Sequence, residues 1–449
     1  MSKEQGSESA VSGSQFIKEE EMAEEKEAPR KLSRKDFVKG AAAVAGAGAL
    51  ASCAPAATPA PTCPPAAECP PCPTPWIPET WDEEADVVVC GYGTGGMPAA
   101  IEAYDAGAEV LIIEKLDWTG GAARRCGGQI FGGPTIVQKA LGIADSADAI
   151  YDYLVACGQG WADQALLRVL ADNCGPNVDW IIQDLGGEEW LPAQFGEGAE
   201  GGLLLSHNHY KDFGFEEVMR SHAFNPAGPG WKDGYPGGTG MYKVWDDAVQ
   251  AREIRTMLET GLVELVATPD REVLGIRASS KGTTLYIKAR KAVVLTTGGW
   301  INNAKMLRDY NPFQPLYPGG LVDVTTDQYV PVIGRLNVED PDQSHGEGIV
   351  AAQAIGADLT NMSVASNVPY NMPNANDYTG GWNSGGLSIN TQAQVIDVFG
   401  DPIPRLYAAP FAAGGTYGYY DPAGGVHIAT AFCFGRISGQ NAAAEQPWG

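Results

Sequence analysis

Glycine recurs between residues 91 and 96 at a spacing suited to phosphate binding. The stretch reads Gly91-Tyr-Gly93-Thr94-Gly95-Gly96 and satisfies the G-x-G-x-x-G pattern at its first, third and sixth positions. In that pattern one glycine turns the chain, one lets the backbone approach a pyrophosphate, and one lets a helix pack on a strand. Free N–H groups at the start of the following helix then attract the phosphates. The chemistry that these residues indicate is dinucleotide binding.

The elements around this turn are those that the pattern requires. Asp86–Cys90 is a short apolar, β-branched run typical of a buried parallel strand, and Met97–Ala106 predicts a helix. A second strand is expected at Glu109–Ile113, and it ends at Glu114, which is placed to accept ribose hydroxyls. Strand, helix, strand and acidic residue predict a Rossmann-type unit.

Further glycines favour FAD over NAD. Two pairs, Gly120-Gly121 and Gly127-Gly128, lie seven residues apart, so that a loop can wrap a pyrophosphate and pass close to a flavin ring. A later strand, Ala292–Gly299, also ends in paired glycines. The full set of candidate cofactor-binding residues is Gly91, Gly93, Thr94, Gly95, Gly96, Glu114, Lys115, Gly120, Gly121, Ala122, Gly127, Gly128, Thr297, Gly298, Gly299, Gly424 and Gly425.

These stretches resemble the fumarate reductase/succinate dehydrogenase flavoprotein family, which includes 3-ketosteroid dehydrogenases. The resemblance rests on Asp86–Lys115, Gly120–Gly133 and Ala292–Gly299, and it continues through residues 345–349, 356–359, 386–391, 403–409, 424–425 and 434–439. It implies FAD as cofactor. It also implies that the dipole of the last helix stabilises the reduced, anionic flavin.

The resemblance and the composition together predict an α/β fold. We expect a discontinuous Rossmann-type FAD-binding domain at residues 84–155, 240–350 and 385–449, with an inserted α+β substrate-capping domain at 156–239 and a shortened cap remnant at 351–384. The capping segment is rich in glycine, asparagine and aromatic residues. Its tryptophans suit an apolar substrate or form part of a core.

The N-terminal 83 residues predict export and a tether. Ser33–Lys39 is charged and precedes an apolar stretch, Gly40–Leu50, so residues 1–53 resemble a twin-arginine signal peptide in which lysine replaces the second arginine. Leu50–Cys53 resembles a bacterial lipobox; the alternative is an uncleaved or conventionally cleaved signal. Residues 54–83 form a Pro-rich linker. We expect an extracytoplasmic protein that contacts the cell membrane only through a lipid anchor.

The net charge and the cysteine content limit which binding partners and metal sites are expected. A formal net charge of −25 argues against nucleic acid and against anionic membrane surfaces as partners. The nine cysteines and five histidines form no cluster with metal-ligand spacing, so no metal site is expected. Cys69 and Cys72 have the spacing of a redox motif but lie among prolines, where a disulfide is the expected fate.

The resemblance also suggests where proton transfer occurs. Steroid dehydrogenases of the family carry a tyrosine in a Tyr-Pro-Gly-x-Gly loop before the last helix; here the tyrosine lies one residue early and Asp421 takes its place. This implies that Tyr420, helped by Tyr419 or Asp421, is the acid/base partner of flavin hydride transfer. His427 is a second candidate. The alternatives are tyrosines that only wall the pocket and a histidine that faces the flavin as a neutral donor.

Fumarate is not an expected substrate. Family members that reduce it hold its carboxylates with histidine and arginine, but Trp382 and Pro422 occupy the matching positions of a clamp histidine and a clamp arginine. After Tyr370 the only Lys or Arg residues are Arg405 and Arg436, both in structural motifs. A buried carboxylate without a cationic partner is costly.

Two functions remain open on the sequence. The first is an FAD-dependent oxidoreductase that acts by flavin hydride transfer on a carbon–carbon bond next to a carbonyl, in a small enone or unsaturated acid. Its electrons would be exchanged with a separate carrier, a quinone pool or a cytochrome, because the chain has no haem motif. The alternative is a degenerate FAD-binding lipoprotein that serves as an electron-transfer or interaction subunit.

Overall fold

The computed structural model describes residues 77–126, 128–187, 194–195, 199–200, 203–205, 208–224, 238–300, 303–310, 322–323, 328–329, 344–363, 365–369, 379–418 and 420–448. All of them belong to the unit Pro71–Gly449. The predicted export signal, Cys53 and most of the Pro-rich linker lie outside these residues. Within the described part of the chain, no helix is both long and apolar enough to cross a membrane.

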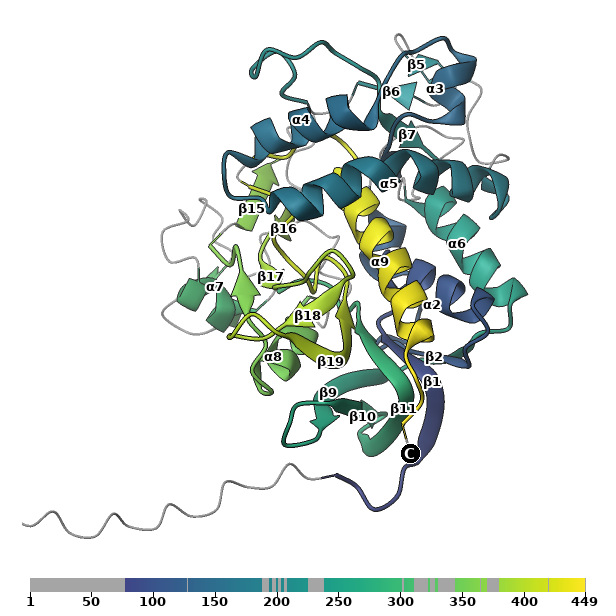
Figure 1. The fold of residues 1–449 in the computed structure, drawn as a ribbon, viewed down its shortest axis with the longest axis vertical. Helices are drawn as coiled ribbons and strands as arrows, with labels where there is room; N and C mark the ends of the chain where they lie inside the picture. The colour runs from purple at the N-terminus through teal and green to yellow at the C-terminus, as the bar shows by residue number, and fades with distance from the viewer. Residues whose placement is uncertain are drawn as a thin grey trace, which may run out of the picture. The chain divides into compact units, whose positions relative to one another are not determined.

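A mixed sheet of eight strands carries the fold (Figure 1). Its strands follow the order β18-β19-β11-β1-β2-β8, and β10 and β9 continue from β11 as an antiparallel ribbon. The neighbours β19, β11, β1, β2 and β8 are parallel, which confirms the predicted α/β class. The strands are β1 (Glu83–Cys90), β2 (Val110–Ile113), β8 (Arg255–Met257), β9 (Thr260–Ala267), β10 (Val273–Ser280), β11 (Thr283–Leu295), β18 (Gln394–Ile396) and β19 (Pro402–Ala408).

Buried β-branched residues explain why the parallel strands form the centre. Val88 of β1 lies opposite Leu111 of β2 on one side and Val293 of β11 on the other, and all three side chains are fully buried. A strand buried on both faces has no polar side and reads as a continuous apolar run. The long β11 also reaches beyond this centre to pair with β10, and this part of the strand begins exposed at Thr283 and Thr284 and becomes more buried toward the centre.

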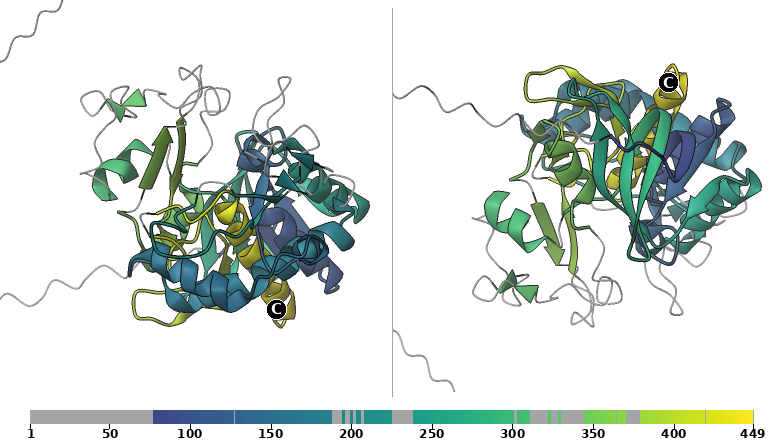
Figure 2. Two further views of the ribbon diagram at one scale, coloured as in Figure 1. Left: turned by 90° about the horizontal axis from the view of Figure 1, so that it is seen from above. Right: turned by 90° about the horizontal axis from the view of Figure 1, so that it is seen from below.

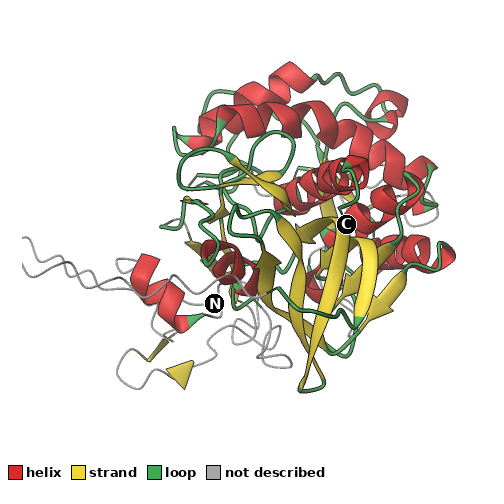
Figure 3. Ribbon diagram, turned by 60° about the horizontal axis from the view of Figure 1, so that its bottom comes forward, coloured by secondary structure: helices red, strands yellow, loops and turns green. Residues whose placement is uncertain are grey.

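Helices α2 (Gly96–Asp105) and α9 (Val426–Ala444) pack against each other over this sheet (Figures 1 and 3). They approach closely because glycine faces backbone at two turns of α9. A Cβ atom on Gly435 would lie 2.4 Å from the Gly95 carbonyl oxygen, and one on Gly439 would lie 2.1 Å from that of Ala99. The start of α2 is therefore fixed by residues about 340 positions later in the chain.

A second, five-stranded sheet joins segments from both sides of the predicted capping boundary. Its order is β3-β7-β6-β5-β4. Figure 2 shows the molecule from above and from below, coloured along the chain as in Figure 1. These strands are β3 (Gln129–Phe131), β4 (Gln194–Phe195), β5 (Ala199–Glu200), β6 (Leu203–Leu204) and β7 (Ser221–Ala223). The domain boundaries themselves stay predictions.

The remaining elements are helical or form short pairs. The helices are α3 (Ile136–Ala140), α4 (Ala147–Gly158), α5 (Gln164–Gln183), α6 (Thr239–Ala251), α7 (Ala304–Tyr310) and α8 (Glu347–Gln353), with a 3-10 turn η1 (Gly121–Arg125). The strand pairs are β12 (Val322–Asp323) with β13 (Gln328–Tyr329), β14 (Leu359–Thr360) with β17 (Gly386–Leu387), and β15 (Ala365–Pro369) with β16 (Thr379–Asn383).

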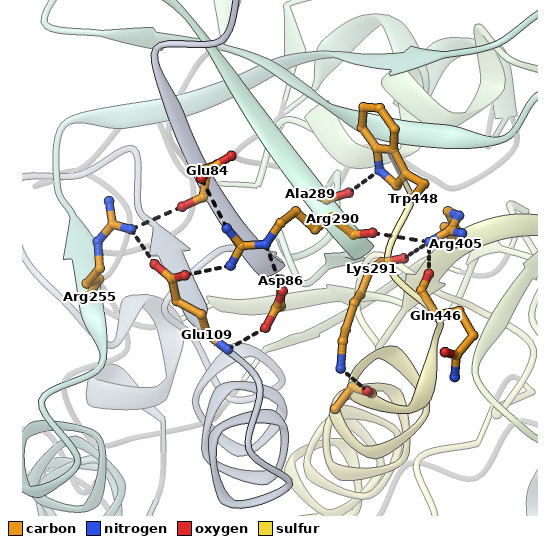
Figure 4. A network of polar contacts seen from close by, with 11 residues as sticks. Glu84, Asp86, Glu109, Arg255, Ala289, Arg290, Lys291, Arg405, Gln446 and Trp448 are labelled. Carbon is orange, nitrogen blue, oxygen red and sulfur yellow. Dashed lines mark hydrogen bonds and ion pairs between the residues drawn. The ribbon is translucent and has the colours of Figure 1, made fainter.

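A polar network fastens the N-terminal edge of the parallel strands to the C-terminal segment (Figure 4). Arg290 of β11 forms ion pairs with Asp86 at 2.8 Å and Glu109 at 2.5 Å. Arg405 of β19 forms an ion pair with Glu272 at 2.7 Å and donates to the Gln446 carbonyl at 2.6 Å. The Arg405 guanidinium is thus committed to structure at this edge.

The α2–α9 contact can be tested by a glycine substitution, because the sign of the change in the free energy of unfolding distinguishes a packed from an exposed position. Gly439→Ala should lower the free energy of unfolding by about 1–3 kcal/mol, because the added methyl group meets the Ala99 carbonyl. In an exposed helix interior the same change would stabilise by about 1 kcal/mol. Urea unfolding of the full chain measures the difference. A Gly439→Ala variant as stable as the wild type would contradict this packing.

Candidate cofactor and active site

In the turn between β1 and α2, the neighbouring atoms leave no room for a side chain at Gly91 but leave open space at Gly93. Gly91 has φ +116°, and a Cβ there would lie 2.4 Å from the Thr296 carbonyl oxygen. The Thr296 hydroxyl donates to the Gly91 carbonyl at 3.0 Å. At Gly93, by contrast, an added Cβ meets no protein atom within 4 Å. Thr94, Gly95 and Gly96 complete the turn and begin the helix.

Two helix N-termini in this region begin with glycine and carry no side-chain cap. Helix α2 has Gly95 at its N-cap and α9 has Gly425, and neither receives a capping hydrogen bond from a side chain. Each start carries a partial positive charge that attracts an external acceptor. At α2 the N–H groups of Gly96 and Met97 both donate to the Gly93 carbonyl at 3.1 Å and Pro98 has no N–H, so this start offers its charge and not free N–H groups of the helix. These ends suit a pyrophosphate at α2 and an electron-rich ring edge at α9.

Glu114 stands at the end of β2, as the motif predicts. Its carboxylate accepts hydrogen bonds from the backbone N–H of Tyr92 at 2.9 Å and of Leu116 at 3.0 Å. Burial raises the pKa of Glu114, while these two hydrogen bonds oppose the shift. The side chain is therefore held beside the glycine turn, at the place where the motif requires an acceptor for ribose.

Lys115 has a partner that sequence reasoning missed. Its ammonium group lies 2.6 Å from Glu347 Oε1, at the start of α8. The other oxygen, Glu347 Oε2, is buried and has no hydrogen-bond partner among the described residues. The only signal was the position of Glu347 in the family loop 345–349. Its buried oxygen is an acceptor that fits a bound hydroxyl group.

The glycine loops after β2 and β11 converge on the same turn. Gly120 N–H donates to the Tyr92 carbonyl at 2.9 Å and begins η1, which contains Gly121 and Ala122. The Gly128 carbonyl accepts from Phe224 N–H at 3.0 Å, whereas Gly127 lies outside the described residues.

The loop after β11 is tied to the start of α8. The Thr297 hydroxyl accepts from Gly348 N–H at 3.2 Å, and the Gly299 carbonyl, one residue beyond Gly298, accepts from Gly346 N–H at 3.0 Å. Thr297, Gly298 and Gly299 therefore lie beside the Lys115–Glu347 pair.

The start of α9 is held against the second sheet. The Gly424 carbonyl accepts from the Ser221 hydroxyl at 2.6 Å, and the Gly425 carbonyl accepts from Phe131 N–H at 3.1 Å. Ser221 belongs to β7 and Phe131 to β3. The predicted cofactor residues Gly424 and Gly425 thus lie against the second sheet.

The four catalytic candidates occupy different surroundings. Tyr420 is 43% exposed, and its ring meets His209 and Phe213 edge-on, with centroids 5.1 Å and 5.4 Å away. Asp421 is largely enclosed, with 20% of its side chain exposed, and its Oδ1 atom is buried with no hydrogen-bond partner among the described residues. Tyr419 lies outside the described residues.

Asp421 and His427 face each other, and burial makes both of them neutral near pH 6. His427 Nε2 lies 3.6 Å from Asp421 Oδ1, too far for a hydrogen bond. Loss of water raises the pKa of Asp421 to about 7 and lowers the pKa of His427 to about 3. Tyr417, whose ring centroid lies 4.4 Å from that of His427, also has a pKa raised by burial. Asp421 is therefore poised to exchange a proton near neutral pH.

The positions of the family's carboxylate clamp offer no cation. Trp382 lies in β16, and its side chain is outside the described part of the structure. The Pro422 carbonyl accepts a hydrogen bond from the Tyr153 hydroxyl. Arg436 forms an ion pair with Glu102, which it contacts at 2.6 Å, and stacks over Trp180. Among the described residues, no group of three or more His, Cys, Asp or Glu side chains could hold a metal ion.

A glycine turn, two uncapped helix N-termini and an acidic strand end define a dinucleotide-binding flavoprotein. The model of the FAD binding domain family matches residues 86–381, and the chain belongs to this family. Its predicted membership of the fumarate reductase/succinate dehydrogenase flavoproteins and its predicted cofactor, FAD, are confirmed. It is an FAD-dependent oxidoreductase.

Two relatives and one structure illustrate the similarity. Urocanate reductase of Eggerthella lenta is 24% identical over an alignment of 489 positions, gaps included, that covers 82% of this chain and 76% of that protein. A fumarate reductase (cytochrome) of Shewanella frigidimarina is 30% identical over 233 residues, 51% of this chain and only 36% of that protein. The crystal structure of 3-ketosteroid-Δ4-(5α)-dehydrogenase from Rhodococcus jostii RHA1 shares the fold, with TM-score 0.66, 23% identity, and coverage of 81% of this chain and 98% of that one.

The open space at Gly93 predicts a variant that folds but binds FAD poorly. Gly93→Ala should leave the thermal stability of the FAD-free full chain unchanged, because its methyl group meets no protein atom within 4 Å. It should weaken FAD binding by about tenfold or more, because the motif needs close backbone approach to the pyrophosphate there. Flavin fluorescence titration measures the affinity. Gly91→Ala is the contrasting variant and should destabilise the FAD-free chain; equal FAD affinity of Gly93→Ala and wild type would count against the site.

Proposed function

We propose that the protein transfers a hydride to or from a carbon–carbon bond conjugated with an uncharged carbonyl group, as in an enone. FAD, when bound, supplies the hydride chemistry, held by the β1–α2 turn, Glu114, and the starts of α2 and α9. The relatives named above support this class of reaction through their printed names, which refer to urocanate, fumarate and a 3-ketosteroid. The choice of a neutral substrate rests on this chain's own residues.

The choice of a neutral substrate rests on Arg405 and Arg436, the two arginines after residue 370, because both form ion pairs with other residues of the protein. Arg405 pairs with Glu272 and Arg436 with Glu102. The described side chains that gather at the start of α9 are Tyr417, Asp421 and His427, together with the ring of Phe411, which stacks on His427. These groups are neutral or acidic, and would desolvate a substrate carboxylate without compensating its charge. An uncharged carbonyl fits them better.

Proton transfer is assigned to the loop before α9. A reduction needs one proton for the carbon or oxygen that receives no hydride, and a protonated Asp421 can donate it. Its buried Oδ1 has no hydrogen-bond partner among the described residues, so a substrate atom can take that place. Tyr420, the first candidate on the sequence, becomes the second candidate here, and its ring position against His209 also suits a wall of the substrate site.

Electrons are proposed to reach or leave the flavin through a separate carrier, a quinone pool or a cytochrome. The twin-arginine-like N-terminus and the lipobox at Cys53 support an extracytoplasmic location, with a lipid anchor and the Pro-rich linker holding the enzyme near such a carrier.

A matched pair of acceptors tests the neutral-substrate proposal. The FAD-loaded full chain is reduced anaerobically with dithionite and mixed with fumarate, dimethyl fumarate or a cyclic enone. We expect the enone and the diester to reoxidise the flavin at least about a hundredfold faster than fumarate, because only fumarate brings unpaired carboxylates into the site. Stopped-flow flavin absorbance measures the rates. Faster reoxidation by fumarate would contradict the proposal, and a flavin that no acceptor reoxidises would favour the electron-transfer or interaction subunit.

The pKa of Asp421 predicts the pH dependence of reduction. Since the donor must be protonated, the rate should fall as pH rises through about 7. Asp421→Asn should lower the rate by about 10²–10⁴-fold and remove this fall, because an amide does not ionise. Rates of enone reduction between pH 5 and 9 measure both effects.

Tyr420→Phe is the matched control, and it should retain the wild-type pH profile. A profile lost in Tyr420→Phe and kept in Asp421→Asn would assign the proton to the tyrosine.

The stability of the protein offers an independent check of the Asp421 pKa. The folded state keeps the Asp421 proton up to about pH 7, whereas the unfolded chain releases it near pH 4. The free energy of unfolding should therefore decrease across this interval in the wild type, and decrease less in Asp421→Asn.

A further inference from the structure

Tyr153 of α4 joins two segments that lie far apart in the sequence. Its side chain is fully buried. The phenol oxygen accepts a hydrogen bond from the backbone N–H of His209 at 2.9 Å and donates one to the Pro422 carbonyl. A single hydroxyl group thus links segment 208–215, within the predicted capping domain, to loop 420–425 before α9.

Aromatic contacts join the same two segments. The ring of Tyr153 stacks on that of Tyr210 with centroids 4.2 Å apart and meets Phe215 edge-on at 5.6 Å. From the other side, the ring of Tyr420 lies edge-on to His209 and Phe213. Segment 208–215 therefore contacts loop 420–425 directly through Tyr420 and indirectly through Tyr153.

The link reaches the surroundings of Asp421. Pro422 follows Asp421 in the chain, and Cys157, one turn after Tyr153 on α4, interacts with both the Tyr153 phenol and the Asp421 carboxyl group. Among the residues that the structure describes, the titratable groups found to interact with Asp421 are Cys157 from α4, His427 from α9 and Tyr417 from the preceding loop. Burial raises the pKa of Cys157 to about 12 and of Tyr417 well above its ordinary value, so neither thiol nor phenol is charged near pH 7.

We propose that Tyr153 is a positioning residue that makes segment 208–215 and loop 420–425 one unit, so that the aromatic wall of the site and Asp421 move together. The hydroxyl has no equivalent replacement: without it, the His209 N–H and the Pro422 carbonyl lose a shared buried partner. Its effect on rate rests on the function proposed above, whereas the link between the segments does not.

Tyr153→Phe tests the link, because it removes the hydroxyl and keeps the stacked ring. Tyr210→Phe is the matched control: it removes a phenol from the same ring cluster, but one whose oxygen accepts from Arg220 at 3.2 Å instead of binding the loop. Hydrogen exchange is measured on the FAD-loaded full chain by mass spectrometry of peptides covering 208–215 and 420–425. We expect exchange in both segments to rise together by about tenfold in Tyr153→Phe, and exchange in 420–425 to stay at the wild-type level in Tyr210→Phe.

Kinetics supply the second readout. With an enone acceptor, Tyr153→Phe should lower kcat by about tenfold, change KM by less than about threefold, and shift the pH at which kcat halves. A variant that merely loses stability while kcat and the pH profile stay as in the wild type would overturn the proposal. So would faster exchange in 208–215 alone. If no enone is turned over but both segments exchange faster, the proposed function fails and the link stands.

A measurement on the wild type keeps the test decisive even if Tyr153→Phe does not fold. In native-state exchange with increasing denaturant, the two segments should open with the same free energy and the same denaturant dependence, because they form one unit. Opening of 208–215 at lower denaturant than 420–425 would overturn the proposal.

Discussion

The approach of α9 to α2 is the contact on which the rest of the site depends. Gly435 faces the carbonyl of Gly95, and Gly439 faces that of Ala99, so the two helices pack backbone against backbone. This contact places the uncapped start of α2, next to the glycine turn, in fixed relation to a helix whose own uncapped start lies near Asp421 and His427. One end of the cofactor site is built from residues near 91 and the other from residues near 425, and they are connected by this packing and by the Arg436–Glu102 ion pair between α9 and α2.

The two ends differ in what they offer a ligand. The β1–α2 end supplies the partial positive charge of the α2 start, the Glu114 carboxylate and the Lys115–Glu347 pair, which suit phosphates and hydroxyl groups. The start of α9 supplies a helix dipole, a neutral imidazole and a carboxyl group whose burial raises its pKa to about 7. We therefore propose that acid/base chemistry near neutral pH takes place at the second end, because loss of water there brings the pKa of a proton donor into range.

Local patterns predicted the β1–α2–β2 unit well. The β1–α2–β2 unit has the expected order, with α2 beginning one residue before the predicted start, because strand, glycine turn and helix are adjacent in the chain. Of the strand expected at residues 292–299, only residues 292–295 are strand, and they form the end of the longer β11, whose less buried first half pairs with β10. That half alternates polar and apolar residues and carries little of the continuous apolar signal on which the prediction relied.

Contacts between residues that lie far apart in the chain could not be predicted from the sequence. Lys115 and Glu347 are 232 positions apart, and Tyr153 and Pro422 are 269 apart, so no local spacing reveals either pair. The choice between Tyr420 and Asp421 likewise depends on burial, which follows from how α4, α9 and segment 208–215 meet around the loop. A neighbouring tyrosine and aspartate in one loop look equivalent in sequence, yet 43% of Tyr420 is exposed whereas Asp421 Oδ1 is buried.

The central claim is that FAD spans the two helix starts, with its reactive ring at the start of α9. An experimental structure of the full chain with FAD and a neutral enone tests this most directly. The account predicts the pyrophosphate at the Gly91–Gly96 turn, the flavin ring beside Gly424 and Gly425, and the enone within reach of Asp421. A flavin ring bound away from α9, or an enone carbonyl that contacts neither Asp421 nor Tyr420, would contradict it.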